Sequence, residues 1–591
     1  MSAVRIVVAA AALIDLAIVL LVLAVGRLSL RIGPVRLRST GDERLGAISV
    51  AIWALCAFVL WRPRWLRRVA VAGLVIVFVL GVVLLARRTP FVFPIGDGAV
   101  IESYTLLATQ GKLLLGPYSR FIWHHPGPMY FLLLAPFYVM TGYQSPGVHV
   151  GALAINVLSL VALAWIVRRT ASGVLSLALA VFAALFVWRT SDLLVSTWNP
   201  HVTLVPTLTL IPLCAAAAAG DLWLVPLVAV VATFIAQTHV GFAPLALAVS
   251  GMALAGAVAC ARSPRGLFDA RVRRVLNITA WVIVVLWLPP IVEQLTRSPG
   301  NLTRLWQFFV GDHGPTQPLG RVFVAWAESL SAPFAPAMKP GWGSPFRPSG
   351  QWWPAGFGAL QTLLVAAVAA WAAITARRFL AVMAGMSLLA SAVAFWSVSR
   401  IAEDLVDHEV FWIAALGALN GAVIVAGIAG AIGARTGRSW RAPGRLVAAA
   451  SWMPVAISVV MGVYYLGNPR GFSPMQRTED AQVRTLVGGI QSYLRGNGVS
   501  KPLFLMDFRT WAVTAGIVLQ LERAGVGLAV EDSAVPIFSD AVAPTGDEDA
   551  EITIALTPRH VELAERADNR LIASYERYYA DVVRLTPTRH R

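Results

Sequence analysis

The residues best suited to chemistry lie in residues 95–138, which read IGDGAVIESYTLLATQGKLLLGPYSRFIWHHPGPMYFLLLAPFY. This stretch places Asp97 between two glycines, and a short helix-like run and a turn locked by proline and glycine follow. A carboxylate on a turn can act as a general base that takes the proton of an acceptor hydroxyl. The alternative is that Asp97 is a turn or N-cap residue before a helix that begins at Ala99.

Other side chains of this stretch suit a charged substrate. Glu102, five residues after Asp97, either helps to bind an acceptor or a metal ion or belongs to a solvated helix face. Four basic or imidazole groups suit a lipid-linked phosphate or pyrophosphate near the bilayer surface. They are Lys112, Arg120, His124 and His125. For Lys112, ordinary snorkelling at the membrane interface is the alternative.

The elements that must position these residues are membrane-spanning helices. The 591 residues are 57% hydrophobic and 13% charged, a composition that excludes a soluble globular protein of this length. A span needs about 20 apolar residues, and about thirteen segments meet this criterion. They lie near 4–26, 45–61, 69–87, 146–167, 171–189, 201–219, 222–240, 242–261, 275–293, 353–376, 379–399, 409–433 and 446–466.

The net charge of +17 indicates membrane topology rather than nucleic-acid binding, because arginines gather in short loops between the apolar segments. These loops lie within 62–68, 168–169, 262–274, 377–378 and 435–445. All are cytoplasmic if the N-terminus is inside and if residues 129–141 form an interfacial or re-entrant helix instead of a span. Only residues 27–44, which contain arginines and then lie outside, fit this topology poorly.

This topology brings further polar residues to the outer face, at the ends of apolar segments. They are Arg189, Trp198, Asn199, His201 and His239. Polar residues in such places are costly to bury and often mark function, although a single histidine is more often structural. The turn at 403–408 has metal-ligand residue types without fixed spacing, and we interpret it as a solvated loop.

The composition changes after Leu466, where charges return and apolar runs shorten. Residues 501–507, 526–530 and 552–556 are predicted strands, and residues 479–494, 510–524 and 558–566 are predicted helices. We expect a small α/β domain outside the membrane, with a loose acidic loop at 547–551. The three cysteines lie in apolar segments without metal-ligand spacing, which excludes a disulfide scaffold and a structural zinc site.

Residues 95–141 resemble the GT-C superfamily of membrane glycosyltransferases, which contains protein mannosyltransferases, aminoarabinose transferases and mycobacterial arabinofuranosyltransferases. The motifs that carry the resemblance are Asp97 within Gly-Asp-Gly, Glu102 after it, and the run HHPGPMYFLLLAPFY. The chain departs from the common paired acidic motif because Gly98 follows Asp97. A divalent metal therefore stays possible but is not implied.

The resemblance implies an all-α polytopic membrane protein with a small C-terminal α/β extracytoplasmic domain. Additional helices would occupy 1–68, and a GT-C-like catalytic module would occupy 69–466, with outer loops at 88–145 and 294–352. The extracytoplasmic domain would occupy 467–591. The protein would be a multi-pass protein of the plasma membrane with a cytoplasmic N-terminus.

The resemblance also implies transfer of a sugar from a polyprenyl phosphate to a glycan, lipid or protein acceptor, by one inverting displacement. Asp97 would be the base, with Glu102 as the second catalytic candidate. The donor phosphate would contact Lys112, Arg120, His124, His125 and Arg189. The substrates would contact Tyr118, Trp123, Trp198, Asn199, His201 and His239.

Three other functions are weighed against this one. A lipid-linked sugar flippase or transporter needs ionisable residues or broken helices near the midplane, whereas only Asp15 lies deep in an apolar segment. A glycan polymerase or ligase would share the lipid-phosphate chemistry and differ in product size. A non-catalytic scaffold would leave the polar stretch at 95–128 unexplained.

Overall fold

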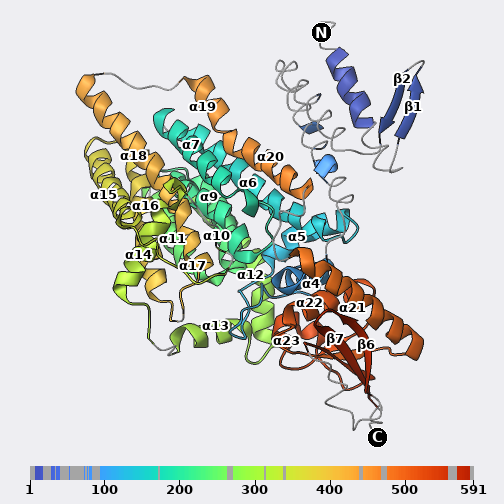
Figure 1. Cartoon of the computed structure of the whole chain (residues 1–591). Coiled ribbons are helices and arrows are strands. Elements are labelled where there is room, and N and C mark those ends of the chain that lie inside the picture. Colours follow the sequence, from blue (N-terminus) through green and yellow to red (C-terminus); the bar gives the residue numbers. More distant parts are fainter. Residues whose placement is uncertain are drawn as a thin grey trace.

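The structure, a computed structural model, describes residues 93–585 except 171–172, 262–269, 312–314, 337–340, 342, 403, 438–442, 468–475 and 557–568. In the first 92 residues it describes 7–17, 28–32, 35–39, 52, 72–73, 76 and 79–82. Within these residues, eight helices are long and apolar enough to cross a membrane (Figure 1). The chain is therefore a polytopic membrane protein, as the composition predicts.

The bundle contains ten apolar helices between Pro146 and Gly467, which correspond to ten of the predicted spans. Eight meet the length of a span, although α9 and α20 do so only with the helical turns before them, as Asn199–Ala218 and Leu446–Gly467. The helices α7 and α10 are shorter. The helices are α6 (Pro146–Thr170), α7 (Gly173–Arg189), α9 (Leu204–Ala218), α10 (Val225–Thr238), α11 (Ala243–Cys260), α12 (Ala270–Thr296), α15 (Trp352–Ile374), α16 (Arg378–Ser399), α18 (Ile413–Thr436) and α20 (Met453–Gly467). The predicted spans at 45–61 and 69–87 lie largely outside the described residues, and of 4–26 only 7–17 is described, as helix.

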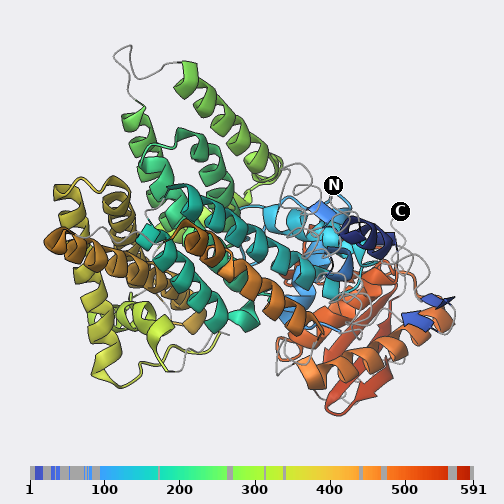
Figure 2. The same cartoon turned by 90° about the horizontal axis from the view of Figure 1, so that it is seen from above.

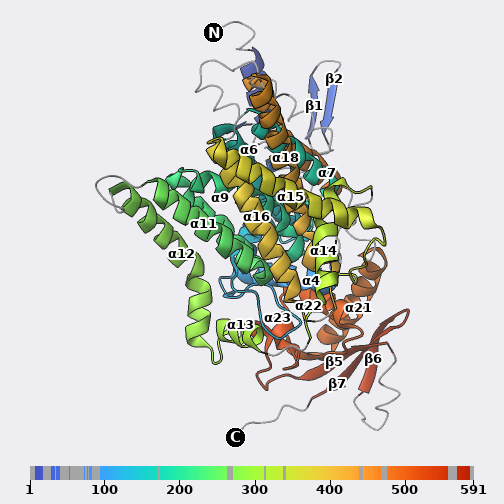
Figure 3. The same ribbon diagram turned by 90° about the vertical axis from the view of Figure 1, so that its left-hand side faces the viewer.

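The helix α9 forms the centre of the bundle, where it packs against α6, α11 and α16. Every residue of α9 is buried, and its last turn consists of the alanines 215–218. Such small side chains let neighbouring backbones approach closely. The helix α12, by contrast, lies at the rim (Figure 3) and exposes apolar side chains such as Trp281, Val285 and Leu288. These side chains are placed where lipid would contact them.

Two short helices lie between the bundle and the C-terminal domain (Figure 1). The helix α4 (Gly96–Thr109) packs against α5 (Met129–Met140), and α5 packs against α6. With 12 residues, α5 is about 18 Å long, which is shorter than the bilayer core. It buries Tyr130, Phe131, Leu134 and Tyr138 and exposes Leu132. This length agrees with the prediction that residues 129–141 do not span.

The C-terminal domain is the predicted small α/β domain, and it lies beside the bundle (Figure 2). Its five strands have the order β4-β3-β5-β7-β6. They are β3 (Pro502–Leu505), β4 (Ala529–Val530), β5 (Ala550–Ala555), β6 (Asn569–Tyr575) and β7 (Tyr578–Arg584). The helices α21 (Gln476–Asn497) and α22 (Trp511–Arg523) confirm two predicted helices. The predicted helix at 558–566 lies outside the described residues.

Two parts of that prediction need correction. The predicted strands do not include the hairpin of β6 and β7, because polar residues such as Arg570 in β6 and Asp581 in β7 limit its apolar runs to two or three residues. The acidic loop at 547–551 is not loose. Glu548 accepts hydrogen bonds from the Thr545 and Gly546 amides at 2.8 and 2.9 Å, and Asp549 accepts one from the Ser500 amide at 2.7 Å. Carboxylates that bond to nearby backbone amides order a loop in this way, and β5 already begins at Ala550.

In the N-terminal part, β1 (Leu28–Ile32) and β2 (Val35–Ser39) form an antiparallel pair. This pair lies in the segment 27–44, the one that fits the predicted topology poorly.

Candidate active site

Asp97 lies in the first turn of α4, where the helix dipole favours a carboxylate. The helix begins at Gly96, whose φ of 52° lies in the left-handed region that glycine adopts readily. The interpretation of Asp97 as an N-cap before Ala99 is therefore wrong, because Ile95 occupies the N-cap position. A Cβ on Gly96 would meet the ring of Trp511, from the C-terminal domain, at 3.4 Å.

Two aromatic side chains hold the Asp97 carboxylate. The Tyr118 hydroxyl donates a hydrogen bond to Oδ1, and the Trp198 side chain forms a second hydrogen bond with the same carboxylate. Burial raises the pKa of Asp97 above its usual range, and the two hydrogen bonds offset part of that rise. Since neither partner carries a positive charge, the carboxylate keeps its basicity.

The ring of Trp198, which bonds to Asp97, also contacts two histidines. Its ring centroid lies 4.9 Å from that of His201 and 4.7 Å from that of His408. His201 is buried with both ring nitrogens bonded, Nδ1 to the Ser196 hydroxyl at 2.9 Å and Nε2 to the Gly341 carbonyl at 2.5 Å. His201 therefore supports the Trp198 ring from a fixed position.

His408 connects the group to a cation and to a second histidine. The Arg120 guanidinium lies close enough to His408 to interact with it electrostatically, and His408 interacts in the same way with His239. His239 stacks on His125 with ring centroids 4.7 Å apart. Burial lowers the pKa of His125 well below its usual range and that of His239 to about 3, so both rings are neutral at pH 7.

The resulting group of seven residues is named the Asp97 cluster. It consists of Asp97, Tyr118, Arg120, His125, Trp198, His239 and His408.

The loop that supplies Tyr118, Arg120 and His125 folds back on itself. The His125 amide donates to the Pro117 carbonyl at 2.8 Å, and the Gly116 amide donates to the His125 carbonyl at 3.0 Å. A Cβ on Gly116 would lie 2.7 Å from the His125 carbonyl oxygen, so this close approach requires glycine. The imidazole of His125 is also fixed, because its Nδ1 accepts a hydrogen bond from the Val240 amide at 3.0 Å.

Glu102 is placed away from the Asp97 cluster. Its side chain is fully buried, accepts a hydrogen bond from the Tyr138 hydroxyl at 2.8 Å and lies 3.2 Å from an Arg523 nitrogen. Arg523 belongs to α22 of the C-terminal domain. Glu102 therefore joins this domain to α4 and does not face a solvated surface.

His124 also faces the C-terminal domain instead of the Asp97 cluster. Its Nε2 lies 3.0 Å from the Tyr104 hydroxyl, and that hydroxyl donates to the Ile537 carbonyl at 3.0 Å. The His124 backbone exchanges hydrogen bonds with the Asn301 side chain, both at 2.8 Å. Burial lowers the pKa of His124 to about 4, so the ring is neutral at pH 7.

The remaining predicted residues lie around or away from the cluster. Trp123 is buried against Phe308 and the ring of His125. Asn199 donates to the Thr238 carbonyl at 3.2 Å, next to His239. Lys112 is exposed after the end of α4, and Arg189 donates to the Ala335 carbonyl at 2.6 Å.

Sequence reasoning missed two residues of this region. Residue 403 lies outside the described residues and Asp404 is exposed, but the interpretation as a solvated loop is wrong for 405–408. Asp407 accepts hydrogen bonds from the Gly343 and Ser344 amides at 2.8 and 3.1 Å, which fixes the turn. His408 directly precedes a span, so the argument applied to His239 also applies to it. For Trp511, which comes from another domain, no local pattern gave a signal.

A metal ion is not supported by the described side chains. Among them, no group of three or more His, Cys, Asp or Glu residues is arranged to hold one. The partners of Asp97 are a phenol and an indole, which are poor metal ligands. We therefore derive no step through a metal.

No protein-family model and no curated protein matches this chain. Among solved structures, the chain is similar to ArnT from Cupriavidus metallidurans bound to undecaprenyl phosphate, with 15% identity and a TM-score of 0.45 over 86% of this chain and 98% of that chain. It is also similar to the apo state of the same protein, with 14% identity and a TM-score of 0.39 over 87% and 98% of the two chains.

Proposed function

We propose that this protein is a membrane glycosyltransferase of the GT-C type. It transfers a sugar from a polyprenyl-phosphate carrier to a hydroxyl of a cell-envelope glycan, lipid or protein. The observation that carries the proposal is the Asp97 cluster. Among the described residues, its carboxylate forms no ion pair, and the Nδ1 atoms of His239 and His408 have no hydrogen-bond partner, while the Arg120 guanidinium lies in the same cluster.

Asp97 is the proposed base. Burial raises its pKa, which makes the carboxylate a stronger base than one in water. The hydrogen bonds from Tyr118 and Trp198 fix its orientation. The carboxylate oriented in this way is the proposed acceptor for the proton of the incoming hydroxyl.

Arg120, His408 and His239 are the proposed ligands of the donor phosphate. The Nδ1 atoms of His239 and His408 are buried and have no hydrogen-bond partner among the described residues, and the nearest carboxylate oxygen to the His408 Nδ1, from Asp407, is 4.0 Å away. Buried polar atoms of this kind normally have a partner. Phosphate oxygens would supply it, and the Arg120 guanidinium would balance their charge.

The proposed reaction is one inverting displacement. The acceptor oxygen loses its proton to Asp97 and forms a bond to C1 of the sugar, while the bond between C1 and the phosphate oxygen breaks. The polyprenyl phosphate leaves with the bonding electron pair, and the Arg120 guanidinium stabilises the charge on it. No nucleotide is needed, because the lipid carrier holds the donor in the membrane.

We place the Asp97 cluster on the extracytoplasmic face. His408 lies at the start of the long helix pair 407–436, whereas Arg435 lies at its other end. In the same way, α6 begins beside the C-terminal domain and ends at Arg168 and Arg169. Short arginine-rich ends are typical of the cytoplasmic side, which supports an extracytoplasmic position for the cluster and the C-terminal domain.

The test is transfer of a radiolabelled sugar from defined polyprenyl-phosphate sugars to endogenous acceptors in membranes. Asp97→Asn is compared with wild type and with Asp404→Asn, which changes an exposed carboxylate outside the cluster. We expect transfer by wild type and by Asp404→Asn, and loss in Asp97→Asn at equal protein level. Transfer retained by Asp97→Asn would remove the base assignment, and no transfer from any donor by wild type would refute the proposed function.

A further inference from the structure

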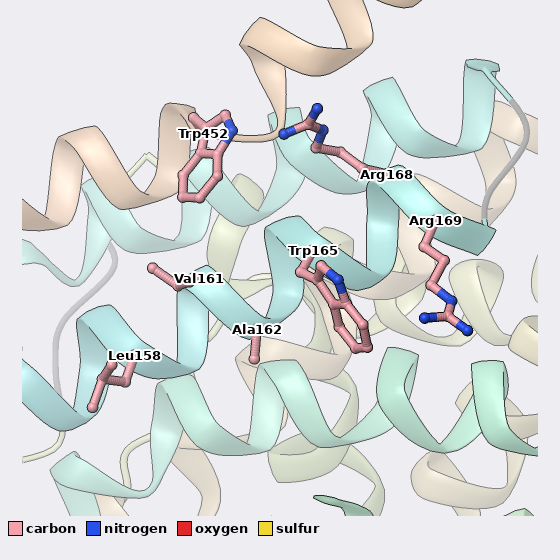
Figure 4. A pocket seen from close by; sticks show the side chains of 7 residues that line it. All are labelled: Leu158, Val161, Ala162, Trp165, Arg168, Arg169 and Trp452. Carbon is pink, nitrogen blue, oxygen red and sulfur yellow. The ribbon is translucent and has the colours of Figure 1, made fainter. Parts of the chain in front are cut away.

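A cleft of about 630 Å³ opens on the bundle, and Figure 4 shows the side chains that line it. Its wall comes from the C-terminal half of α6 and from Trp452, just before α20. The lining includes Leu158, Val161, Trp165, Arg168, Arg169 and Trp452. The volume is within the range of small-molecule sites.

The position of the cleft along α6 gives its depth. The start of α6 lies beside the C-terminal domain, where Arg523 donates to the Ser145 hydroxyl at 3.4 Å. Arg169 lies 24 residues further on, which is about 35 Å along a helix and more than the bilayer core of about 30 Å. The cleft therefore reaches the membrane interface opposite to the Asp97 cluster.

The two arginines of the cleft differ in their partners. Arg169 forms an ion pair with Asp221 at 2.9 Å, and its guanidinium lies 5.3 Å from the centre of the Trp165 ring. Arg168 is exposed, and it forms no ion pair or hydrogen bond with the residues that the structure describes. One cation is therefore compensated, and the other is available to an anionic ligand.

The remaining lining matches the rest of such a ligand. Leu158 and Val161 continue the cleft from the arginines towards the membrane interior, and both Trp165 and Trp452 are partly exposed. Tryptophan is enriched at the level of lipid head groups, and basic pockets between helices on the cytoplasmic side bind anionic head groups.

We infer that this cleft binds one anionic phospholipid of the cytoplasmic leaflet, with its phosphate on Arg168 and an acyl chain along Leu158 and Val161. The site is separate from the proposed donor site, and only its assignment to the cytoplasmic leaflet rests on the orientation proposed with the function. Its ligand is a membrane lipid and not a soluble phosphate, because most of the lining is apolar.

The test uses the purified full-length protein with phosphatidylglycerol and phosphatidylcholine at equal amounts, and bound lipid is counted by native mass spectrometry. We expect wild type to retain one phosphatidylglycerol in preference to phosphatidylcholine. Arg168→Gln should weaken phosphatidylglycerol binding by about fivefold. Arg435→Gln is the matched control, because it removes an exposed arginine from the end of α18, outside the cleft, and it should leave binding unchanged.

A second variant tests the apolar part while every arginine is kept. Ala162 also lines the cleft, and Ala162→Phe should displace the acyl chain and lower binding in protein that elutes and melts as wild type does. The inference is overturned by equal binding in wild type and Arg168→Gln, by equal losses in Arg168→Gln and Arg435→Gln, or by displacement with millimolar glycerol phosphate. Preferential retention of polyprenyl phosphate in this cleft would also overturn it.

Discussion

The helix α4 carries two carboxylates in opposite situations. Asp97 is half-buried and receives hydrogen bonds from Tyr118 and Trp198, which are neutral. Glu102 is fully buried and faces the Arg523 guanidinium at 3.2 Å. Five residues rotate the side-chain direction by about 140° around a helix, so one acid points to the bundle and the other to the C-terminal domain. A carboxylate whose charge is balanced joins elements, whereas one without a cation is free to accept a proton.

The largest effect expected from the difference between Asp97 and Glu102 is a loss of activity without a loss of stability. Asp97→Asn should reduce transfer by about 10²- to 10⁴-fold, because a general base is removed while both hydrogen-bonding neighbours stay in place. Thermal unfolding in detergent should be unchanged. If the same variant also unfolds at much lower temperature, Asp97 has a structural role like that of Glu102.

The opposite result is expected at the other acid. Arg523→Met should destabilise docking of the C-terminal domain by about 3–5 kcal/mol, because Glu102 is left buried without its cation. Limited proteolysis should then release the domain. The control is Arg297→Met. It breaks an exposed ion pair between Arg297, at the end of α12, and Asp540 of the C-terminal domain, and it should weaken docking of the domain by less than about 1 kcal/mol. Equal effects of the two variants would contradict the distinction between buried and exposed pairs.

A smaller effect is expected to distinguish Arg120 from Lys112, which the sequence alone predicts as ligands of the same phosphate. Arg120→Gln should lower kcat/KM for the polyprenyl-phosphate sugar by roughly ten- to a hundredfold, since a charged hydrogen bond contributes about 1.5–3 kcal/mol. Lys112→Gln should leave kcat/KM unchanged, because Lys112 is exposed and lies outside the Asp97 cluster. Equal losses in the two variants would show that only the local charge matters.

The smallest effect concerns pH. Burial raises the pKa of Glu522, which accepts a hydrogen bond from Ser103 of α4 at 2.5 Å, to about 7. The folded protein therefore binds this proton more tightly than the unfolded chain does. The resulting stability is fully present below the unfolded pKa of about 4.5 and is lost as the pH rises through about 7.

Melting curves between pH 5 and pH 8 measure this dependence. Glu522→Gln should flatten the fall in melting temperature, whereas Glu531→Gln should not, because Glu531 bonds to Ser533 within the domain. An unchanged slope in Glu522→Gln would show that other groups cause the dependence.

The amino-acid sequence by itself determined the class of protein, the position of the ten predicted spans between 146 and 466, and the existence of the C-terminal domain. Long apolar runs have few alternatives to membrane helices, since a bilayer requires every backbone group to be bonded internally. The length of an apolar run is also readable from the sequence, and α5, with 12 residues, is too short to span. The sequence also singled out Asp97, because glycines around an acid at the end of a span form a local pattern.

The tertiary structure decided which polar residues belong together. Glu102 and His124 were candidates by proximity in sequence, but the C-terminal domain, more than 400 residues further on, supplies Arg523 and the Ile537 carbonyl to this region. His408 joined the Asp97 cluster for the converse reason, since its Trp198 contact links positions 210 residues apart. Such pairings depend on how the helix ends pack in space. The amino-acid sequence does not give the distance between residues on different helices.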